Sequence, residues 1–293
     1  MGDVGERVWR KVPAGAREAL TTGLSPSELQ TALLEVSRER AGAVTPARLV
    51  QRWREDRFVR PSEVDPRALV KTQAMLWERL PERFAGVELS PLTPLGTCSA
   101  VATIHQNMVV STMRSTEVAS DPTNELAIEA SVRRRAGQDR VDLATCQRVV
   151  RAQAVDGPGM FAHFQLFALV SSARDTGSAR IEAELLVDHL RFWHDVLGDQ
   201  AQFTFTTFER TAVRERIDDT VLPALKVEFA EDPERQKGSG YYAGTALGIG
   251  LGDAELGDGG FTRWTAELLG DAKERCLISC VSTERLTAVL SEA

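Results

Sequence analysis

The glycine-rich stretch from residue 237 to 286 constrains the fold more than any other part of the chain. It reads KGSGYYAGTALGIGLGD, then GDGGFTRWTAELLG, and finally CLISCVSTERL. The adjacent tyrosines Tyr241 and Tyr242 open a predicted strand, and the glycines of the second segment predict a turn that leads into an amphipathic helix. The third segment predicts an apolar strand that runs directly into Glu284 and Arg285. A carboxylate and a guanidinium therefore follow the end of a predicted sheet strand.

Composition allows a substantial core and argues against two kinds of partner. A chain of 293 residues with 43% hydrophobic content can form one large domain, or a large and a small one. Its formal net charge of -7 disfavours binding to a phosphate backbone unless basic residues gather on one face. No apolar run reaches the roughly 18–20 residues that cross a bilayer. The N-terminus, MGDVGERVWRKV, lacks the apolar centre of a secretory signal. We therefore expect no membrane association.

The four cysteines give no sign of a metal or disulfide framework. Cys98, Cys146, Cys276 and Cys280 include no CxxC pair. We expect a reduced, cytoplasmic protein without a protein-bound metal.

Residues 1–62 predict a small helical subdomain. The sequence SPSE at 25–28 supplies an N-cap and a first-turn proline for an amphipathic helix through Arg40. Thr-Pro at 45–46 begins a second helix that runs through Arg54. These helices carry no catalytic pattern, so they form either an appended subdomain or a docking surface for a partner.

The next segments alternate helices and strands. Asp65 and the proline after it begin a helix predicted to run to Leu80, and GVELSPLTPLG then predicts a strand that ends in prolines. Met108–Arg114 predicts another strand, and Asp121 with its following proline begins a second helix.

The centre of the chain predicts a strand pair followed by a helix. RVVRAQ at 148–153 and FAHFQLFALVSSA at 161–173 are rich in strand-forming residues and are separated by a Gly-Pro-Gly loop. A helix with one apolar face follows over about 179–197, and the strand QFTFTTFER follows over 202–210.

Taken in order, residues 65–290 resemble the catalytic core of class II aminoacyl-tRNA synthetases, and within them the histidyl-tRNA synthetase type. The resemblance implies an α+β fold in which an antiparallel sheet is flanked by helices. It implies a catalytic core at 63–293, with the helical subdomain at 1–62 outside it. It also implies a homodimer whose interface includes the helix after Asp65 and the following strand, with Pro91 or Pro94 at the family's proline position.

The resemblance further implies that ATP, accompanied by Mg²⁺, is bound between two arginines. Arg151 would reach the α-phosphate, Arg285 would bind other phosphates together with Glu284, and Phe164 would stack on adenine. Gln153 stands where the family has a glutamate and would accept a hydrogen bond from the adenine amino group. Because a planar guanidinium can bind a phosphate group through two nitrogens, Arg151 and Arg285 are the catalytic candidates. Each has an alternative interpretation, as a strand-end charge or a helix-surface charge.

The same resemblance outlines a substrate pocket. A lysine and a threonine stand where the family has an arginine and a glutamate, and the tyrosine pair is kept. The candidate pocket residues are Asp121, Thr123, His163, Gln165, Lys237, Tyr241 and Tyr242. The alternatives are a helix cap for Asp121, a buried hydrogen-bonded histidine for His163, and core residues for the tyrosines.

Several positions depart from the family pattern. The family's second arginine falls on Met160, and Phe261–Arg263 replaces its Arg-Tyr-Asp, which argues against histidine as the substrate. Residues 278–282 (ISCVS) replace glycines in the last signature, and we expect their side chains to occupy nucleotide space.

Two functions remain. The first is an ATP-dependent, adenylate-forming ligase that activates an amino acid or related carboxylate for a non-tRNA acceptor, either a small amine or a carrier protein. The alternative is a catalytically degenerate paralogue that acts as a regulatory or assembly subunit. A true tRNA synthetase is disfavoured by the acidic charge and because no anticodon-binding domain follows Arg285, eight residues before the end of the sequence.

Overall fold

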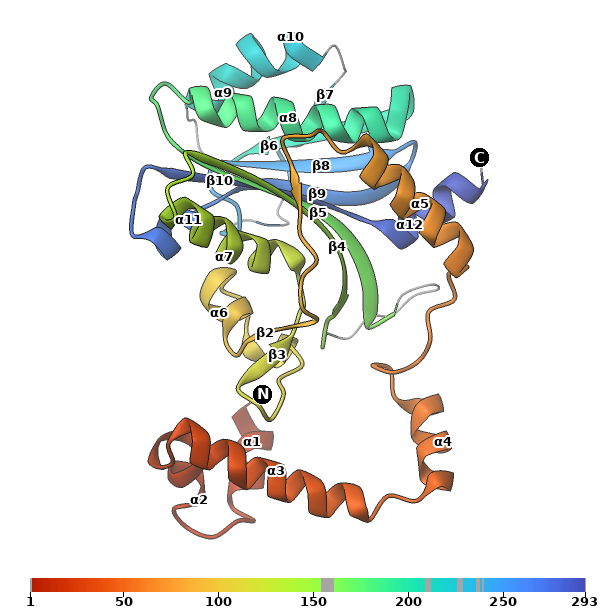
Figure 1. Cartoon of the computed structure of the whole chain (residues 1–293), viewed down its shortest axis with the longest axis vertical. Coiled ribbons are helices and arrows are strands. Elements are labelled where there is room, and N and C mark those ends of the chain that lie inside the picture. The colour runs from red at the N-terminus through yellow and green to blue at the C-terminus, as the bar shows by residue number, and fades with distance from the viewer. Residues whose placement is uncertain are drawn as a thin grey trace.

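An eight-stranded sheet with helices on both faces forms the body of the protein (Figure 1). The computed structural model describes residues 2–153, 161–208, 212–225, 229–235, 238 and 240–292. The strand order is β1-β4-β5-β10-β9-β8-β6-β7. The central pairs are antiparallel, and only the edge pairs β1–β4 and β6–β7 are parallel among the described strands. The predicted α+β fold is therefore confirmed, with a sheet that is mixed at its two edges.

β5, β6 and β10 lie close to predicted strands, whereas β4 begins well before the predicted segment 148–153 and β9 occupies a segment predicted as a turn. The sheet comprises β1 (Ala85–Gly86), β4 (Arg140–Val150), β5 (His163–Arg174), β6 (Ala201–Thr207), β7 (Phe229–Glu231), β8 (Thr245–Leu251), β9 (Ala254–Thr262) and β10 (Glu274–Ser282). A separate two-stranded pair is formed by β2 (Leu92–Pro94) and β3 (Thr116–Val118).

Helices cover both faces and the ends of the sheet. Those of the core are α5 (Pro66–Arg79), α6 (Thr97–Val101), α7 (Pro122–Arg135), α8 (Arg180–Leu197), α9 (Ala212–Arg216), α10 (Leu222–Leu225), α11 (Trp264–Leu269) and α12 (Thr283–Glu292). Short 3-10 turns occupy Gln106–Met108 and Gly198–Gln200, and π turns occupy Ala19–Gly23 and Ile217–Val221. None of the described helices is both long enough and apolar enough to cross a membrane.

Side chains of β10 alternate between the two faces of the sheet. Leu277 and Val281 join the core beneath α8, together with the fully buried Trp193 and Phe167. Ile278 belongs to the smaller core beneath α7 and α11. This alternation follows from the two-residue period of a strand, and it decides which residues of β10 can face a ligand.

The N-terminal helices lie apart from the sheet (Figure 1). They are α1 (Gly2–Trp9), α2 (Ala16–Glu18), α3 (Pro26–Gly42) and α4 (Pro46–Glu55). As the sequence predicts, Ser25 and Glu28 form a capping box at the start of α3. No residue of α2, α3 or α4 is buried, and Val50 and Trp53 of α4 are exposed. The helices therefore form from local signals and contribute no buried residue to the core.

The predicted strand at Met108–Arg114 is wrong. This segment contains the end of a 3-10 turn and a single bridge between Ser111 and Glu117. The backbone N–H of Thr112 donates to the carbonyl of Thr116, and Ser115 has a positive φ of 53°. A tight turn therefore interrupts the run of strand-forming residues.

The glycines in the C-terminal stretch also differ from prediction. Gly257 and Gly259 lie inside β9 instead of forming a turn, and a Cβ at Gly259 would approach the carbonyl oxygen of Ile278 to 2.5 Å. Glycine is required there because the backbones of β9 and β10 pack closely. Gly248 likewise lies within a strand, β8. The tyrosine pair precedes β8, which begins at Thr245.

Candidate active site

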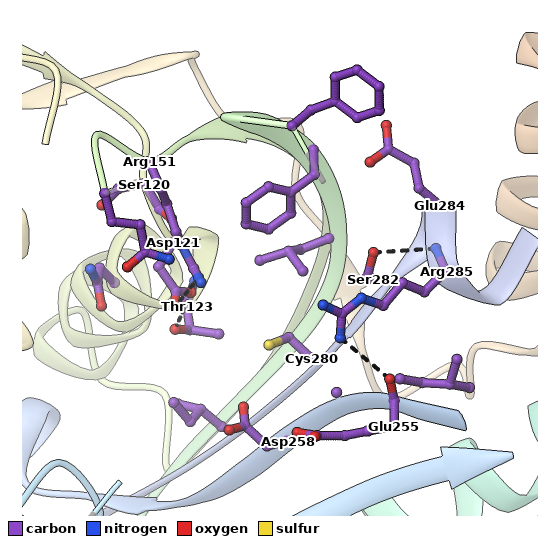
Figure 2. A pocket seen from close by; sticks show the side chains of 18 of the residues that line it. Ser120, Asp121, Thr123, Arg151, Glu255, Asp258, Cys280, Ser282, Glu284 and Arg285 are labelled. Carbon is purple, nitrogen blue, oxygen red and sulfur yellow. Dashed lines mark hydrogen bonds and ion pairs between the residues drawn. The ribbon is translucent and has the colours of Figure 1, made fainter. Parts of the chain in front are cut away.

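A cavity of about 1330 Å³ opens on the α7 side of the sheet (Figure 2). It is lined by β9, β10, the start of α7, the first turns of α12 and the segment before α5. Nine of the predicted site residues line it: Asp121, Thr123, Arg151, Gln153, Phe164, Tyr241, Tyr242, Glu284 and Arg285. His163 and Gln165 lie outside its lining. Lys237 lies outside the residues that the structure describes.

Arg151 is held at one wall of the cavity, directly after the end of β4. Its Nε donates to the carbonyl oxygen of Ser120 at 2.9 Å, and its Nη2 lies 3.3 Å from Oδ2 of Asp121. Its guanidinium carbon lies 5.0 Å from the centre of the Phe164 ring. The two residues assigned by resemblance to phosphate and adenine therefore contact each other directly.

Asp121 joins the helix start to this arginine. Oδ1 of Asp121 accepts hydrogen bonds from the backbone N–H of Thr123 at 3.1 Å and from its hydroxyl at 2.7 Å. This is the N-cap geometry of α7, in which a side-chain oxygen satisfies a free N–H of the first turn. Since Oδ2 faces Arg151, Asp121 is at once a helix cap and a residue of the cavity wall.

Arg285 lies across the cavity from Arg151, on the first turn of α12 (Figure 2). It is exposed, and its Nη1 lies 3.4 Å from the carbonyl oxygen of Glu255. Within the described part of the chain it forms no ion pair with a carboxylate. Its charge is therefore available to an anion in the cavity.

Glu284 and His163 share one partner, Arg148. Oε1 of Glu284 accepts from Nη2 of Arg148 at 2.9 Å, while Nη1 of Arg148 lies 3.0 Å from Nδ1 of His163. A guanidinium can only donate, so Nδ1 accepts and the ring proton is on Nε2. That nitrogen donates to the carbonyl oxygen of Arg60 at 2.8 Å. In this arrangement His163 connects β5 to the N-terminal segment and has no free nitrogen to act as a base.

The segment that links α4 to α5 contacts the open ends of β4 and β5. Arg57 donates to the carbonyl oxygens of Ala152 and Gln153. Ser62 and Glu63 farther along this segment line the cavity. Ser62 and Glu63 therefore contribute to the cavity, which the sequence did not predict.

Gln165 has a partner on α5 instead of in the cavity. Its Oε1 accepts a hydrogen bond from Nε2 of Gln73 at 2.5 Å. The side chain therefore joins β5 to α5.

The tyrosine pair forms an aromatic wall. Tyr241 and Tyr242 are in edge-to-face contact at 4.9 Å, and Tyr241 also contacts Trp264 at 5.3 Å. Burial, with Asp121 near Tyr241 and Asp258 near Tyr242 as lesser causes, raises the pKa of both phenols well above the usual value. Both therefore remain neutral at physiological pH.

The side chains of residues 278–282, which replace family glycines, do not all occupy nucleotide space as expected. Of the five residues that replace family glycines, only Ile278, Cys280 and Ser282 line the cavity. Ser279 and Val281 are buried, and Val281 packs in the core beneath α8. Burial raises the pKa of the Cys280 thiol well above its usual value, so the thiol stays protonated. Three of the five substituted side chains therefore line the cavity, which keeps a volume of about 1330 Å³.

Asp258 was not predicted as a cavity residue, and the burial of Glu125, which lies outside the cavity lining, was not predicted either. Asp258 lines the cavity from β9 and forms an ion pair with Arg235 at 3.2 Å. Glu125, on the first turn of α7, is buried, and desolvation raises its pKa to about 8. Asp258 could have been identified in the sequence, because it is a carboxylate flanked by glycines within a strand. The burial of Glu125 has no sequence signal, because an exposed first-turn glutamate would look the same.

No group of three or more His, Cys, Asp or Glu side chains among the described residues is arranged to hold a metal ion.

The sheet order and the flanking helices match the fold of the class II aminoacyl-tRNA synthetase catalytic core. No protein-family model matches the sequence, and a search of the curated proteins gives no significant match. Similarity appears instead in three dimensions, which confirms the predicted resemblance at the level of the fold.

The chain is similar to the apo histidyl-tRNA synthetase of Staphylococcus aureus, with a TM-score of 0.57, 17% identity, and coverage of 78% of this chain and 68% of that one. It is similar to a protein from Bacillus halodurans described as an ATP phosphoribosyltransferase regulatory subunit/histidyl-tRNA synthetase (TM-score 0.59, 12% identity, 79% and 82% covered). It is also similar to the pyrrolysyl-tRNA synthetase of Desulfitobacterium hafniense (TM-score 0.55, 14% identity, 84% and 75% covered).

Proposed function

We propose that the cavity binds ATP and activates the carboxylate of an amino acid or a related acid for transfer to a non-tRNA acceptor. The observation that supports this most strongly is the pair Arg151 and Arg285, which line opposite sides of one cavity (Figure 2). Each guanidinium is a planar donor that suits a phosphate group.

The proposed reaction requires alignment and charge neutralisation more than covalent help from the protein. A carboxylate oxygen attacks the α-phosphorus of ATP, a C–O–P linkage forms, the bond to the β-phosphate oxygen breaks, and pyrophosphate leaves. Arg285 can neutralise the leaving pyrophosphate because no carboxylate of the described residues pairs with it. Arg151 must give up its ion pair with Asp121 in order to bind the α-phosphate. Mg²⁺ usually binds to phosphates plus one or two carboxylates, so its arrival with ATP would not require a preformed cluster, and the described residues contain none.

We also propose an acceptor, an oligomeric state and a cellular compartment. The acceptor would be a small amine or a carrier protein, since the net charge of -7 disfavours tRNA. A homodimer is supported by exposed apolar side chains on α5 and β2, such as Val70 and Leu92. All four cysteines are unpaired, which suits a reducing cytoplasm.

One feature favours a second candidate, a regulatory or assembly subunit without catalysis. The described lining of the cavity carries six carboxylates (Glu63, Asp65, Asp121, Glu255, Asp258 and Glu284) against the two arginines. ATP brings several negative charges, which these carboxylates repel. A cationic or zwitterionic ligand alone would fit this charge balance better than a nucleotide.

ATP–pyrophosphate exchange separates the two candidates. The full chain would be assayed with Mg²⁺ and a panel of amino acids and simple carboxylic acids. Calorimetry would be run in parallel with ATP-Mg²⁺ and with each acid. Exchange that depends on one class of acid is the expected result. Binding of an amino acid without any response to ATP would contradict the ligase and leave the regulatory candidate.

A further inference from the structure

A second cavity, of about 480 Å³, lies on the α8 side of the sheet. It is lined by α8, by the helical turns of residues 216–224, by the segment after α5 and by the first residue of β4. None of its lining residues belongs to the candidate active site.

Four arginines gather at this cavity, although the chain as a whole is acidic. Arg83, Arg140, Arg180 and Arg216 line it, with only Glu184 and Asp188 as acidic members. The described lining therefore has a formal charge of two positive units.

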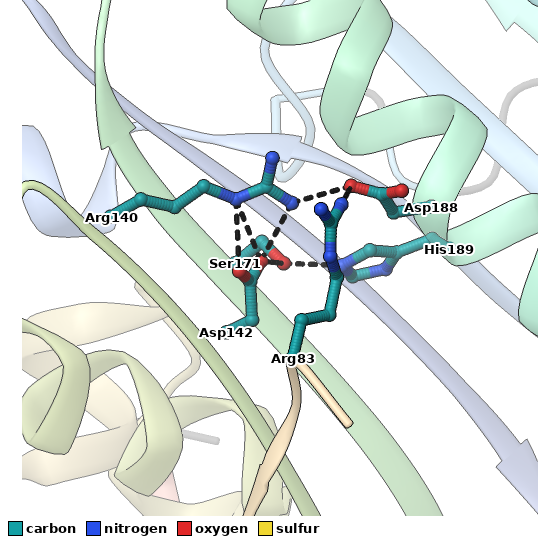
Figure 3. Close-up of polar contacts among 6 residues, drawn as sticks. All are labelled: Arg83, Arg140, Asp142, Ser171, Asp188 and His189. Atoms are coloured by element: carbon teal, nitrogen blue, oxygen red, sulfur yellow. Dashed lines mark hydrogen bonds and ion pairs between the residues drawn. The ribbon is translucent and has the colours of Figure 1, made fainter. Parts of the chain in front are cut away.

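Two of these arginines are fixed in place by carboxylates (Figure 3). Nη2 of Arg140 lies 2.6 Å from Oδ2 of Asp188, and Arg83 donates to the same oxygen. Arg140 also binds Asp142: its Nε lies 2.9 Å from Oδ2, and its Nη2 lies 2.9 Å from Oδ1. The carboxylates set the positions of both guanidiniums and neutralise much of their charge.

A buried hydrogen-bond chain in turn positions Asp142. The Ser171 hydroxyl donates to Asp142 at 2.5 Å and therefore accepts from Nε2 of His189 at 2.9 Å. Nδ1 of His189 accepts from the hydroxyl of Ser279 at 2.9 Å, and Ser279 accepts from the indole of Trp193 at 2.8 Å. Every donor in this chain has an acceptor while His189 is neutral. The arginine beside Asp142 is therefore preorganised by the sheet and α8.

The positive charges of the other two arginines, Arg180 and Arg216, are available to a ligand. Arg216 lines the cavity and uses Nε to donate to the carbonyl of Ser178 at 2.9 Å, and its two terminal nitrogens form no ion pair with a described carboxylate. Arg180 forms no ion pair with any residue that the structure describes, and it is exposed on the first turn of α8. Glu184, one turn farther along α8, offsets only one of these two charges.

We propose that this cavity is a binding site for a small phosphate dianion, either inorganic phosphate or the phosphate group of a phosphomonoester. A phosphate group carries about 1.5 to 2 negative charges near pH 7 and three acceptor oxygens, so it matches two free guanidiniums beside two fixed ones. A single carboxylate would leave one of the guanidiniums without a counter-charge.

The recessed shape favours a small ligand over a nucleic acid. A polymer backbone needs a basic stripe along the surface, whereas these four arginines converge on one hollow and the chain carries a net charge of -7. The site is independent of the proposed carboxylate activation, because it shares no residue with that cavity.

Calorimetric titration with inorganic phosphate and with ribose 5-phosphate would test the site. The test variant is the double substitution Arg180→Gln and Arg216→Gln. Arg191→Gln is the matched control, because Arg191 is exposed on the same helix but lies outside the cavity. Arg285→Gln controls for phosphate binding in the candidate active site. Thermal melting would confirm that all variants are folded.

We expect the double substitution to weaken both probes about tenfold or more, since it removes two charge-assisted contacts. Arg191→Gln should bind both probes like the unaltered protein, whereas Arg285→Gln should remove only phosphate bound in the candidate active site and keep the binding that the double substitution abolishes. Tighter binding of the ester would identify a phosphorylated metabolite, and equal binding would identify free phosphate. The proposal is overturned if the intact protein binds neither probe at millimolar concentration or if the double substitution changes nothing. It is also overturned if a short single-stranded RNA displaces phosphate with higher affinity.

Discussion

Arg151 covers one face of the Phe164 ring, with its guanidinium carbon 5.0 Å from the ring centre. The same arginine is tied to Asp121, so both groups that would meet the nucleotide are already in contact with protein. A cation over an aromatic face contributes about 0.5–1 kcal/mol at a partly exposed site. That interaction is weak enough for a nucleotide bound as proposed to displace it.

Arg285→Ala should abolish most exchange activity while the fold stays intact. The side chain is exposed, and within the described residues it forms only one long hydrogen bond, to Glu255, so the expected loss of stability is below about 0.5 kcal/mol. Loss of a preorganised positive group at a developing charge reduces turnover about a hundredfold or more. Exchange assays and urea denaturation check the two parts. Arg67→Ala, at an exposed arginine outside the cavity, is the control. Strong destabilisation by Arg285→Ala would show that the side chain is structural.

Asp121→Asn should tighten ATP binding about two- to fivefold, the scale of a partly exposed ion pair. Asparagine caps a helix as well as aspartate does, so α7 keeps its start while Arg151 loses its competing carboxylate. Calorimetry with ATP-Mg²⁺ measures the change. Asp65→Asn is a matched control, since Asp65 also caps a helix and lines the cavity but has no contact with Arg151. Weaker ATP binding by Asp121→Asn would argue against the assigned role of Arg151.

Glu125→Gln should stabilise the protein above about pH 5. Burial raises the pKa of Glu125 to about 8 from its ordinary 4.5, so the folded state holds a proton that the unfolded state releases between these values. The unaltered protein therefore loses about 1.4 kcal/mol per pH unit from this group as pH rises through that window. Glutamine removes this dependence. Urea denaturation of both proteins at several pH values would show a gap that widens from pH 5 to 8; a constant gap would contradict the shift.

His189→Leu should produce the opposite pH dependence. Burial lowers the pKa of His189 to about 3 from 6.5, so between these values the unfolded state binds a proton that the folded state does not. The unaltered protein loses about 1.4 kcal/mol per pH unit from this group as pH falls below 6.5. The leucine variant lacks this loss but starts about 1–3 kcal/mol lower, because the Ser279 hydroxyl loses its acceptor. Denaturation curves should therefore show the gap narrowing as pH falls, and a gap independent of pH would refute the shift.

Removal of residues 1–55 should leave the core folded. No residue of α2, α3 or α4 is buried, whereas Arg57 and Arg60 contact the core and are retained. The melting temperature should change by no more than about 2 °C, which corresponds to about 0.5–1 kcal/mol for a domain of this size. Calorimetric scanning of the truncated and full chains makes the comparison. A large drop would place the boundary of the core before residue 56.

Local signals were the reliable part of the sequence. The caps at Ser25, Asp65 and Asp121 start their helices as predicted, because an N-cap acts over only three residues. Failure occurred at Met108–Arg114, where strand-forming residues lie in a turn region closed by a contact between Thr112 and Thr116. Strand propensity depends on neighbouring strands, so a local run of suitable residues is not sufficient.

The sequence by itself determined the order of helices and strands, and that order indicated the class II fold. Tertiary structure alone decided the partners of the charged side chains. Arg148 pairs with Glu284, which is 136 residues away, and Arg151 turns toward Asp121. The tertiary structure also brings together, around one cavity, four arginines: Arg83, Arg140, Arg180 and Arg216. The physical reason is range: caps and strand periodicity act between neighbours along the chain, whereas ion pairs, burial and pKa shifts depend on distances that only the packed sheet sets.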